Sequence, residues 1–331
     1  MSHVARRTIW VLSRLLLIAA GGCGGWPPTP PAPVPTPGAA RVFTEPEAGR
    51  QAVLDLVQAA HASLWMEMYL LTDDGAIAAL ADRAAAGVDV RVILEPSPYG
   101  DADGNQAAYA RLSAAGVDVR WATARFTYTH AKSFTIDHAR LVVLTLNLTR
   151  DGLSGNREYG AIDDDPTDVA ASEAIFAADQ AGAPAVIASP GRVVSSPEST
   201  RPALLGLIQG AQAALALETE ELADPQIVAA LLGARARGVA VTVVWPGPAA
   251  GAGAPFTTLA ASGAIVRAAT APPIHGKVLV ADARTLYVGS ANLTATSLDD
   301  NRELGVRLAQ ADTAGAIGAM VAADAAGGQA P

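Results

Sequence analysis

The stretch HAKSFTID at 130–137 decides the fold, because it returns at 275–282 as HGKVLVAD. Each copy is followed by two more matching segments: TLN at 145–147 and SAN at 290–292, then NRE at 156–158 and at 301–303. Every matching pair is separated by 145 positions. The repeated polar residues are His130 and His275, Lys132 and Lys277, Asp137 and Asp282, Asn147 and Asn292, and Glu158 and Glu303. A fixed register over this length indicates an internal duplication.

Lysine use singles out the same segments. Lys132 and Lys277 are the only lysines in the sequence, and the other 21 of its 23 basic residues are arginines. A compact ammonium group differs in shape and hydration from a planar guanidinium. We therefore expect the two repeats to need an ammonium donor at these two places.

The duplication extends beyond these segments, since 87–94 and 238–245 align with an offset of 151 positions. Hydrophobic periodicity predicts helices at 47–60, 75–86, 201–211 and 225–237, and strands at 63–70, 88–94, 213–219 and 239–245. Each HxKx4D segment is expected to contain a strand, at 133–136 in the first copy and at 278–280 in the second. A tight turn then leads into a second strand, at 141–146 and at 285–288. The fold class is α/β, with two tandem α/β/α sandwich repeats at 41–190 and 191–331 and a mixed sheet in each.

The pattern HxKx4D, followed by GSxN-like residues and a later glutamate, resembles the phospholipase D superfamily. The second copy matches closely through Gly289 to Asn292, whereas the first copy has Leu144 in place of the glycine. The resemblance implies two repeats related by approximate two-fold symmetry, with one active site at their interface. It also implies a two-step reaction through a phosphohistidine, without a metal or cofactor. In that scheme His130 is the nucleophile and His275 the acid and base, although the sequence cannot choose between them.

The residue types agree with phosphoryl chemistry. The spacing does not fit a metal site, and a lysine between the candidate ligands would repel a cation. Lys132 and Lys277 are expected to hold phosphoryl oxygens. Two side-chain amides and two hydroxyls are expected to bind the same phosphate: Asn147, Asn292, Thr145 and Ser290.

Three further pairs of residues complete the expected site. Glu158 and Glu303 are the expected partners for the far ring nitrogens of the histidines, fixing tautomer and orientation. Asp137 and Asp282 lie at turns, and the resemblance gives them a structural role. For Arg157 and Arg302 we favour structural ion pairs over phosphate contacts.

The N-terminal region reads as an export signal over 1–25, with Arg6 and Arg7 before an apolar stretch. Residues 20–23, AGGC, resemble a bacterial lipoprotein cleavage box, with Cys23 as the lipidated residue. An ordinary signal peptide and an uncleaved anchor remain alternatives. Residues 26–40 are rich in proline and predict an extended linker. The protein is therefore expected in the cell envelope, as a membrane-anchored lipoprotein, or secreted.

The net charge of the protein favours one class of substrate over another. The formal net charge is −9, and without the three arginines of 1–25 it becomes −12. Proteins that bind nucleic acid through phosphates usually carry a basic footprint. We therefore expect a phospholipase D that hydrolyses phospholipids at a membrane surface or transfers the phosphatidyl group, acting as a monomer that contains an internal pseudo-dimer. The alternatives are a phosphodiester nuclease of the same superfamily, a cardiolipin-synthase-type transferase, and a binding protein without activity.

Overall fold

The computed structural model describes residues 40–186, 191–247 and 253–330. The first half contains β1 (Arg41–Glu45), α1 (Arg50–Gln58), β2 (Ser63–Met68), α2 (Asp74–Ala85), β3 (Asp89–Leu94), α3 (Gln106–Ala114), β4 (Asp118–Trp121), β5 (Lys132–Ile136), β6 (Arg140–Leu144), α4 (Arg150–Ser154), β7 (Glu158–Asp163) and α5 (Pro166–Ala181). The second half contains β8 (Val193–Ser196), α6 (Thr200–Gly210), β9 (Ala214–Glu218), α7 (Pro225–Ala236), β10 (Ala240–Trp245), α8 (Gly253–Ala261), β11 (Ile265–Ala268), β12 (Val278–Ala281), β13 (Thr285–Gly289), a π-helical turn (Thr296–Asp300), β14 (Glu303–Leu308) and α9 (Ala311–Gly327). The expected signal segment and Cys23, and all of the linker except Ala40, lie outside the described residues.

Each half is built on one seven-stranded sheet, and the two sheets have the same topology. The first sheet has the order β1-β7-β6-β5-β2-β3-β4. The second, taken from β8, has the order β8-β14-β13-β12-β9-β10-β11. In both, three neighbouring strands pair in parallel and the remaining pairs are antiparallel. The fold is therefore the expected pair of mixed-sheet α/β repeats.

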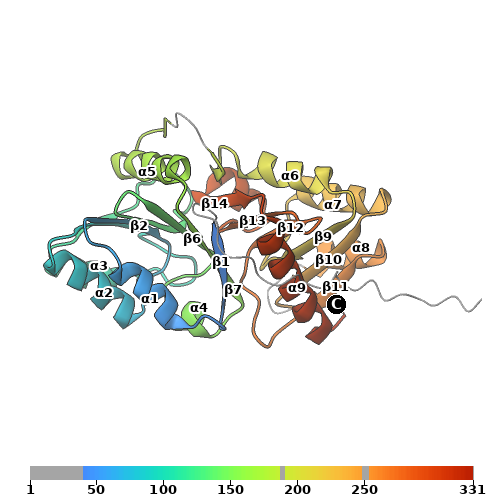
Figure 1. The fold of residues 1–331 in the computed structure, drawn as a ribbon, viewed down its shortest axis with the longest axis horizontal. Coiled ribbons are helices and arrows are strands. Elements are labelled where there is room, and N and C mark those ends of the chain that lie inside the picture. Colours follow the sequence, from blue (N-terminus) through green and yellow to red (C-terminus); the bar gives the residue numbers. More distant parts are fainter. Residues whose placement is uncertain (1–39, 187–190, 248–252, 331) are drawn as a thin grey trace, which may run out of the picture.

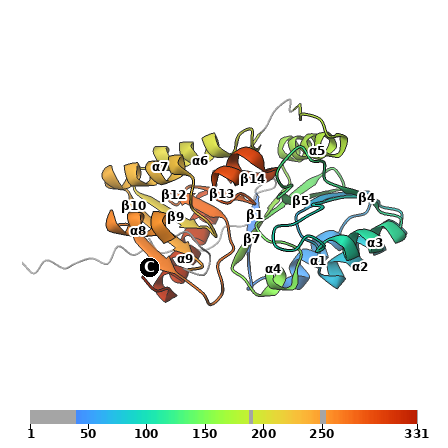
Figure 2. The same ribbon diagram turned by 180° about the vertical axis from the view of Figure 1, so that it is seen from behind.

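Helices cover the two sheets in a pattern that agrees with two-fold symmetry. In Figure 1, α1 to α3 lie below the first sheet and α6 and α7 lie above the second. Apolar side chains of each helix group pack on the facing strands, in one core for each half. A third core contains residues of both halves, including those of α5 and α9 and of the inner faces of both sheets. The halves are thus joined by an apolar core that both contribute to. Figure 2 shows the two halves side by side from the opposite direction.

Matching helix starts close the loops that follow β2 and β9. Asp73 caps α2 by accepting a hydrogen bond from the Ala76 N–H. Asp224 caps α7 in the same way, accepting from the N–H groups of Gln226 and Ile227. Aspartate at an N-cap satisfies backbone donors that the helix itself leaves free. The loops that follow β2 and β9 therefore end in the same way in both halves.

The observed elements differ from the expected ones mainly at their ends. The expected helix at 47–60 begins only at Arg50, because Gly49 has φ 74° and its N–H is bound by the Glu45 carboxylate. The expected strand at 141–146 ends at Leu144. His130 and His275 precede β5 and β12, and each backbone N–H bonds the other half instead of a neighbouring strand of its own sheet. Among the described residues, no helix is long and apolar enough to cross a bilayer.

Candidate active site

Backbone pairing between the halves brings the two motifs together. The His130 N–H donates to the Arg302 carbonyl at 2.8 Å, and the Arg302 N–H donates to the Tyr128 carbonyl at 2.9 Å. The same exchange occurs in reverse, where the His275 N–H donates to the Arg157 carbonyl at 3.2 Å. Each histidine therefore lies beside the NRE segment of the opposite repeat.

The histidine–glutamate pairs cross between the repeats as a consequence. His130 Nδ1 lies 2.9 Å from both carboxylate oxygens of Glu303. His275 Nδ1 lies 2.5 Å from Glu158 Oε1. Both glutamates are fully buried. Because a carboxylate only accepts, each Nδ1 carries a proton and each neutral ring keeps a lone pair at Nε2. The glutamates are the expected partners, and the structure adds that each serves the histidine of the other repeat.

Hydroxyl groups hold the two carboxylates in place. The Thr145 hydroxyl donates to Glu158 at 2.6 Å, and the Ser290 hydroxyl donates to Glu303 at 2.5 Å. Both side chains are fully buried. In this arrangement each hydroxyl gives its single proton to a glutamate, and the expected contact with phosphate stays a prediction. The Ser297 hydroxyl also donates to Glu303.

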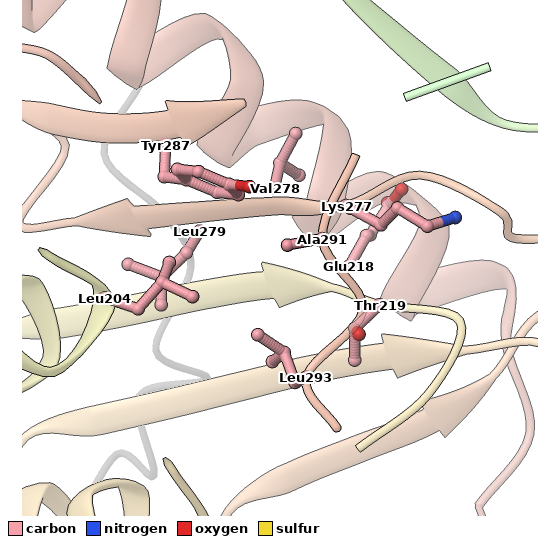
Figure 3. A pocket seen from close by; sticks show the side chains of 9 residues that line it. All are labelled: Leu204, Glu218, Thr219, Lys277, Val278, Leu279, Tyr287, Ala291 and Leu293. Carbon is pink, nitrogen blue, oxygen red and sulfur yellow. The ribbon is translucent and has the colours of Figure 1, made fainter. Parts of the chain in front are cut away.

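The two lysines are anchored through their own histidine backbones. Lys132 Nζ donates to the His130 carbonyl at 2.8 Å, and Lys277 Nζ donates to the His275 carbonyl at 2.6 Å. An ammonium has three donors, so protons remain for a ligand. Figure 3 shows the Lys277 nitrogen pointing away from the apolar side chains of Leu204, Leu279 and Leu293.

Charges from both repeats act on the same groups. Burial, together with the positive charges of Lys132 and Lys277, lowers the pKa of His130 to about 4, despite the attraction of Glu303. Burial and Lys277 lower the pKa of Lys132 to about 7. Burial alone would raise the pKa of Glu303, but His130 and Lys132 hold it below its ordinary value. His130 is therefore neutral at pH 7.

The remaining expected residues fall into two groups. Asp137 accepts the N–H groups of His61, Ala62 and Ser63, and Asp282 accepts those of Gln212, Ala213 and Ala214. These contacts tie the β5–β6 and β12–β13 turns to the starts of β2 and β9, which is the structural role expected of both aspartates. Asn147 and Asn292 are partly buried, and the Oδ1 of each has no hydrogen-bond partner among the described residues.

The arginines beside the glutamates form structural ion pairs, as favoured from the sequence. Arg157 pairs with Asp324 at 2.6 Å and Arg302 pairs with Asp179 at 2.5 Å. Both guanidinium groups are buried. Since Arg157 and Arg302 also supply the backbone groups that bond the histidines, these pairs support the crossed arrangement.

Two residues of the site were not expected. The Tyr69 ring lies 4.4 Å from the His130 ring and 4.8 Å from Lys132 Nζ, measured from its centroid. Glu220 Oε2 lies 3.1 Å from Lys277 Nζ and 3.4 Å from His275 Nε2. The 151-position offset aligns Tyr69 with Glu220. The repeat alignment could have found both positions, but a search for identical residues passes over them because the residues differ.

The arrangement offers two imidazoles oriented by buried carboxylates and two lysines with free donors. In the described part of the chain, no group of three or more His, Cys, Asp or Glu side chains is placed to hold a metal ion. Such a site can hold an anionic phosphoryl group and move protons at both Nε2 atoms.

Comparison with known proteins agrees with this geometry. A family model described as cardiolipin synthase, PLD-like domain, matches residues 53–180 and 204–323. No match is found among curated proteins. Phosphatidylserine synthase from Haemophilus influenzae superposes with a TM-score of 0.63 at 12% identity, covering 83% of each chain. Polyphosphate kinase from Porphyromonas gingivalis gives a TM-score of 0.62 at 15% identity, covering 81% of this chain and 47% of that one.

The present chain therefore spans about half the length of that polyphosphate kinase. A phospholipase D family member, Nuc from Salmonella typhimurium, is 27% identical over 42% of this chain and 95% of its own, with a TM-score of 0.40. The two longer superpositions indicate a shared fold at low identity.

Proposed function

The chain belongs to the phospholipase D superfamily, in the family described as cardiolipin synthase, PLD-like domain, and from this membership and its site geometry we propose that it is a phospholipase D-type phosphodiesterase. The crossed His130–Glu303 and His275–Glu158 pairs carry the proposal. They supply one nucleophile and one proton donor around the same pair of lysines. Enzymes of this superfamily act on phosphodiesters, and the full residue set is present in both repeats.

In the first step the neutral His130 attacks. Its Nε2 lone pair forms a bond to phosphorus while the bond from phosphorus to the leaving oxygen breaks. His275 enters this step as the imidazolium and gives its Nε2 proton to that oxygen, so that the leaving group departs as an alcohol. Lys132 and Lys277 stabilise the negative charge on the phosphoryl oxygens as it develops.

In the second step the phosphohistidine is consumed. Water loses a proton to His275 Nε2, its oxygen bonds to phosphorus, and the bond from phosphorus to His130 Nε2 breaks. The reaction then yields a phosphomonoester and restores both histidines. An alcohol in place of water would give transfer of the phosphatidyl group. Glu158 stabilises the His275 imidazolium through Nδ1, as a buried carboxylate does in a serine-protease triad.

The proposed substrate is a phospholipid at a membrane surface. The supporting observations are the net charge of −9 and the expected export signal and linker at 1–40. A polyanionic nucleic acid is repelled by an acidic protein more strongly than a zwitterionic lipid surface is. We propose that the protein is exported and lies in the cell envelope or outside the cell, as a monomer.

The test compares two substrates under the same conditions. Choline release from phosphatidylcholine vesicles is measured beside nicking of plasmid and single-stranded DNA at moderate salt, with a His275→Asn variant as the inactive control. We expect lipid turnover that requires His275 and is unchanged by a chelator. DNA cleavage without lipid turnover would replace this proposal with a nuclease.

A further inference from the structure

The two repeats differ in the residue that lies beside the histidine ring. The loop after β2 presents Tyr69 to His130, whereas the loop after β9 presents Glu220 to His275. Tyr69 is buried, and its hydroxyl accepts the Tyr99 N–H at 2.6 Å. The Glu220 side chain is 31% exposed. An uncharged ring therefore lies on the nucleophile side, and an accessible carboxylate lies on the side of the acid.

Glu220 is ionised in this setting. Burial alone would raise its pKa, but Lys277 and His275 hold the pKa of Glu220 well below its ordinary value. The neighbouring Glu221 has a raised pKa, because it is partly desolvated and lies close to the Glu220 charge. The loop thus concentrates negative charge beside His275.

A pocket opens next to this carboxylate. Its volume is about 160 Å³, and Glu220, Glu221, Trp245, Phe256 and Thr294 are among its lining residues. The Trp245 and Phe256 rings stack with centroids 4.1 Å apart. Two carboxylates make the pocket unsuitable for an acyl chain, since a buried charge facing hydrocarbon is strongly unfavourable. Carboxylates on the wall of such a pocket attract an ammonium group.

The net charge of the whole site also favours an ammonium group in this pocket. In their ordinary ionised forms, Lys132 and Lys277 contribute two positive charges, and Glu158, Glu303 and Glu220 contribute three negative ones. A protonated His275 brings the sum to zero, and a bound phosphodiester then leaves one negative charge in excess. An ammonium group on the substrate would remove that excess, whereas an anionic head group would increase it.

We propose that Glu220 selects substrates whose leaving alcohol carries an ammonium group, with that group held in the pocket lined by Glu220, Glu221, Trp245 and Phe256. The leaving oxygen takes its proton from His275, so the leaving group lies on the side of Glu220. This inference rests on the proposed phosphodiesterase function and on His275 as the acid. It makes Glu220 a determinant of specificity that the first repeat, with Tyr69, does not duplicate.

The test uses monomeric dioctanoyl phosphatidylcholine and dioctanoyl phosphatidylglycerol, which avoid differences in surface charge between vesicles. The readout is the ratio of kcat/KM for the choline lipid to that for the glycerol lipid. Glu220→Gln should lower this ratio by about two- to fivefold, the effect of one charge contact at a partly exposed site. The Glu221→Gln variant should lower it in the same direction.

Glu173→Gln is the matched control, because it changes the net charge equally while its side chain contacts His138 in the first repeat. We expect the ratio of this control to equal that of the unmodified protein. An unchanged ratio in both Glu220→Gln and Glu221→Gln, with lipid still cleaved, would overturn the inference and leave the proposed function standing. If the unmodified protein cleaves neither lipid nor bis(p-nitrophenyl) phosphate, the proposed function itself fails and the inference fails with it.

Discussion

Replacing the two buried glutamates one at a time separates the roles of the two histidines. In Glu303→Gln, His130 loses the carboxylate whose two oxygens each lie 2.9 Å from its Nδ1. The amide can offer an N–H to Nδ1, which moves the ring proton to Nε2 and removes the attacking lone pair. In Glu158→Gln, His275 can still accept and donate a proton at Nε2. It loses the carboxylate that stabilises its imidazolium form.

The size of the effect follows from the contacts. The Glu303 carboxylate is fully buried and the His130 side chain is only 13% exposed, so the charge-assisted bond is shielded from water. Losing such a bond costs about 2–4 kcal/mol, which is about 30- to 1,000-fold in rate. We expect the loss to fall on phosphorylation in Glu303→Gln and on leaving-group protonation in Glu158→Gln.

The assay is a rapid-mixing experiment with bis(p-nitrophenyl) phosphate, whose leaving group needs little protonation. Glu158→Gln should keep a burst of nitrophenol close to that of the unmodified protein and then turn over slowly. Glu303→Gln should lose the burst. Nitrogen NMR of the imidazoles provides an independent readout, in which Glu158→Gln shifts the signals of His275 and leaves those of His130 unchanged. The reverse outcome in both experiments would refute the crossed pairing.

Four further predictions concern the same site and its support. His130→Ala and His275→Ala should each lose most activity on lipid, and near-normal turnover in either would exclude a two-histidine mechanism. Lys132→Arg and Lys277→Arg should each lower kcat about 100-fold, because the larger planar group displaces the phosphate; rates within threefold would show that any cation suffices. With increasing pH, kcat/KM should rise near pH 4, where His130 becomes neutral, and should fall above about pH 7, where Lys132 loses its charge. A flat profile between pH 4 and 9 would contradict this. Asp137→Ala should lower the free energy of unfolding by about 2 kcal/mol in urea titrations, because three backbone N–H groups lose their acceptor; an unchanged midpoint would mean that the turn holds without it.

The repeated segments predict most of the fold, because the periodicity and the 145-position register both follow from the duplication. Strands such as β3 and β10 end in runs of buried apolar residues, and the helices before them are followed by Gly87 and Gly238, which have positive φ. Strand ends were predicted less well. The strand expected at 141–146 ends at Leu144. The bond from the His130 N–H to Arg302 was not predictable, because no local pattern contains that partner.

The pairing within the site was not predictable from spacing. Each histidine is followed by a glutamate at the same separation in both repeats, so the sequence is compatible with pairs inside a repeat and with pairs between repeats. The fold decides, through backbone bonds between 128–130 and Arg302 and between 273–275 and Arg157. The sequence does not reveal which way a hydroxyl donates, so the bonds from Thr145 and Ser290 to the glutamates could not be predicted. Glu220 was missed because its counterpart is a tyrosine.

The most direct test of the central claim is to trap the covalent intermediate. A His275→Asn variant should form the phosphoenzyme from bis(p-nitrophenyl) phosphate but hydrolyse it slowly, because no base activates water. Quenching without acid, followed by proteolysis and mass spectrometry, should place the nitrophenyl phosphoryl group on the peptide that contains His130, and a chelator should not change its amount. Phosphoryl transfer without any adduct on His130, or an adduct on another residue, would contradict the account.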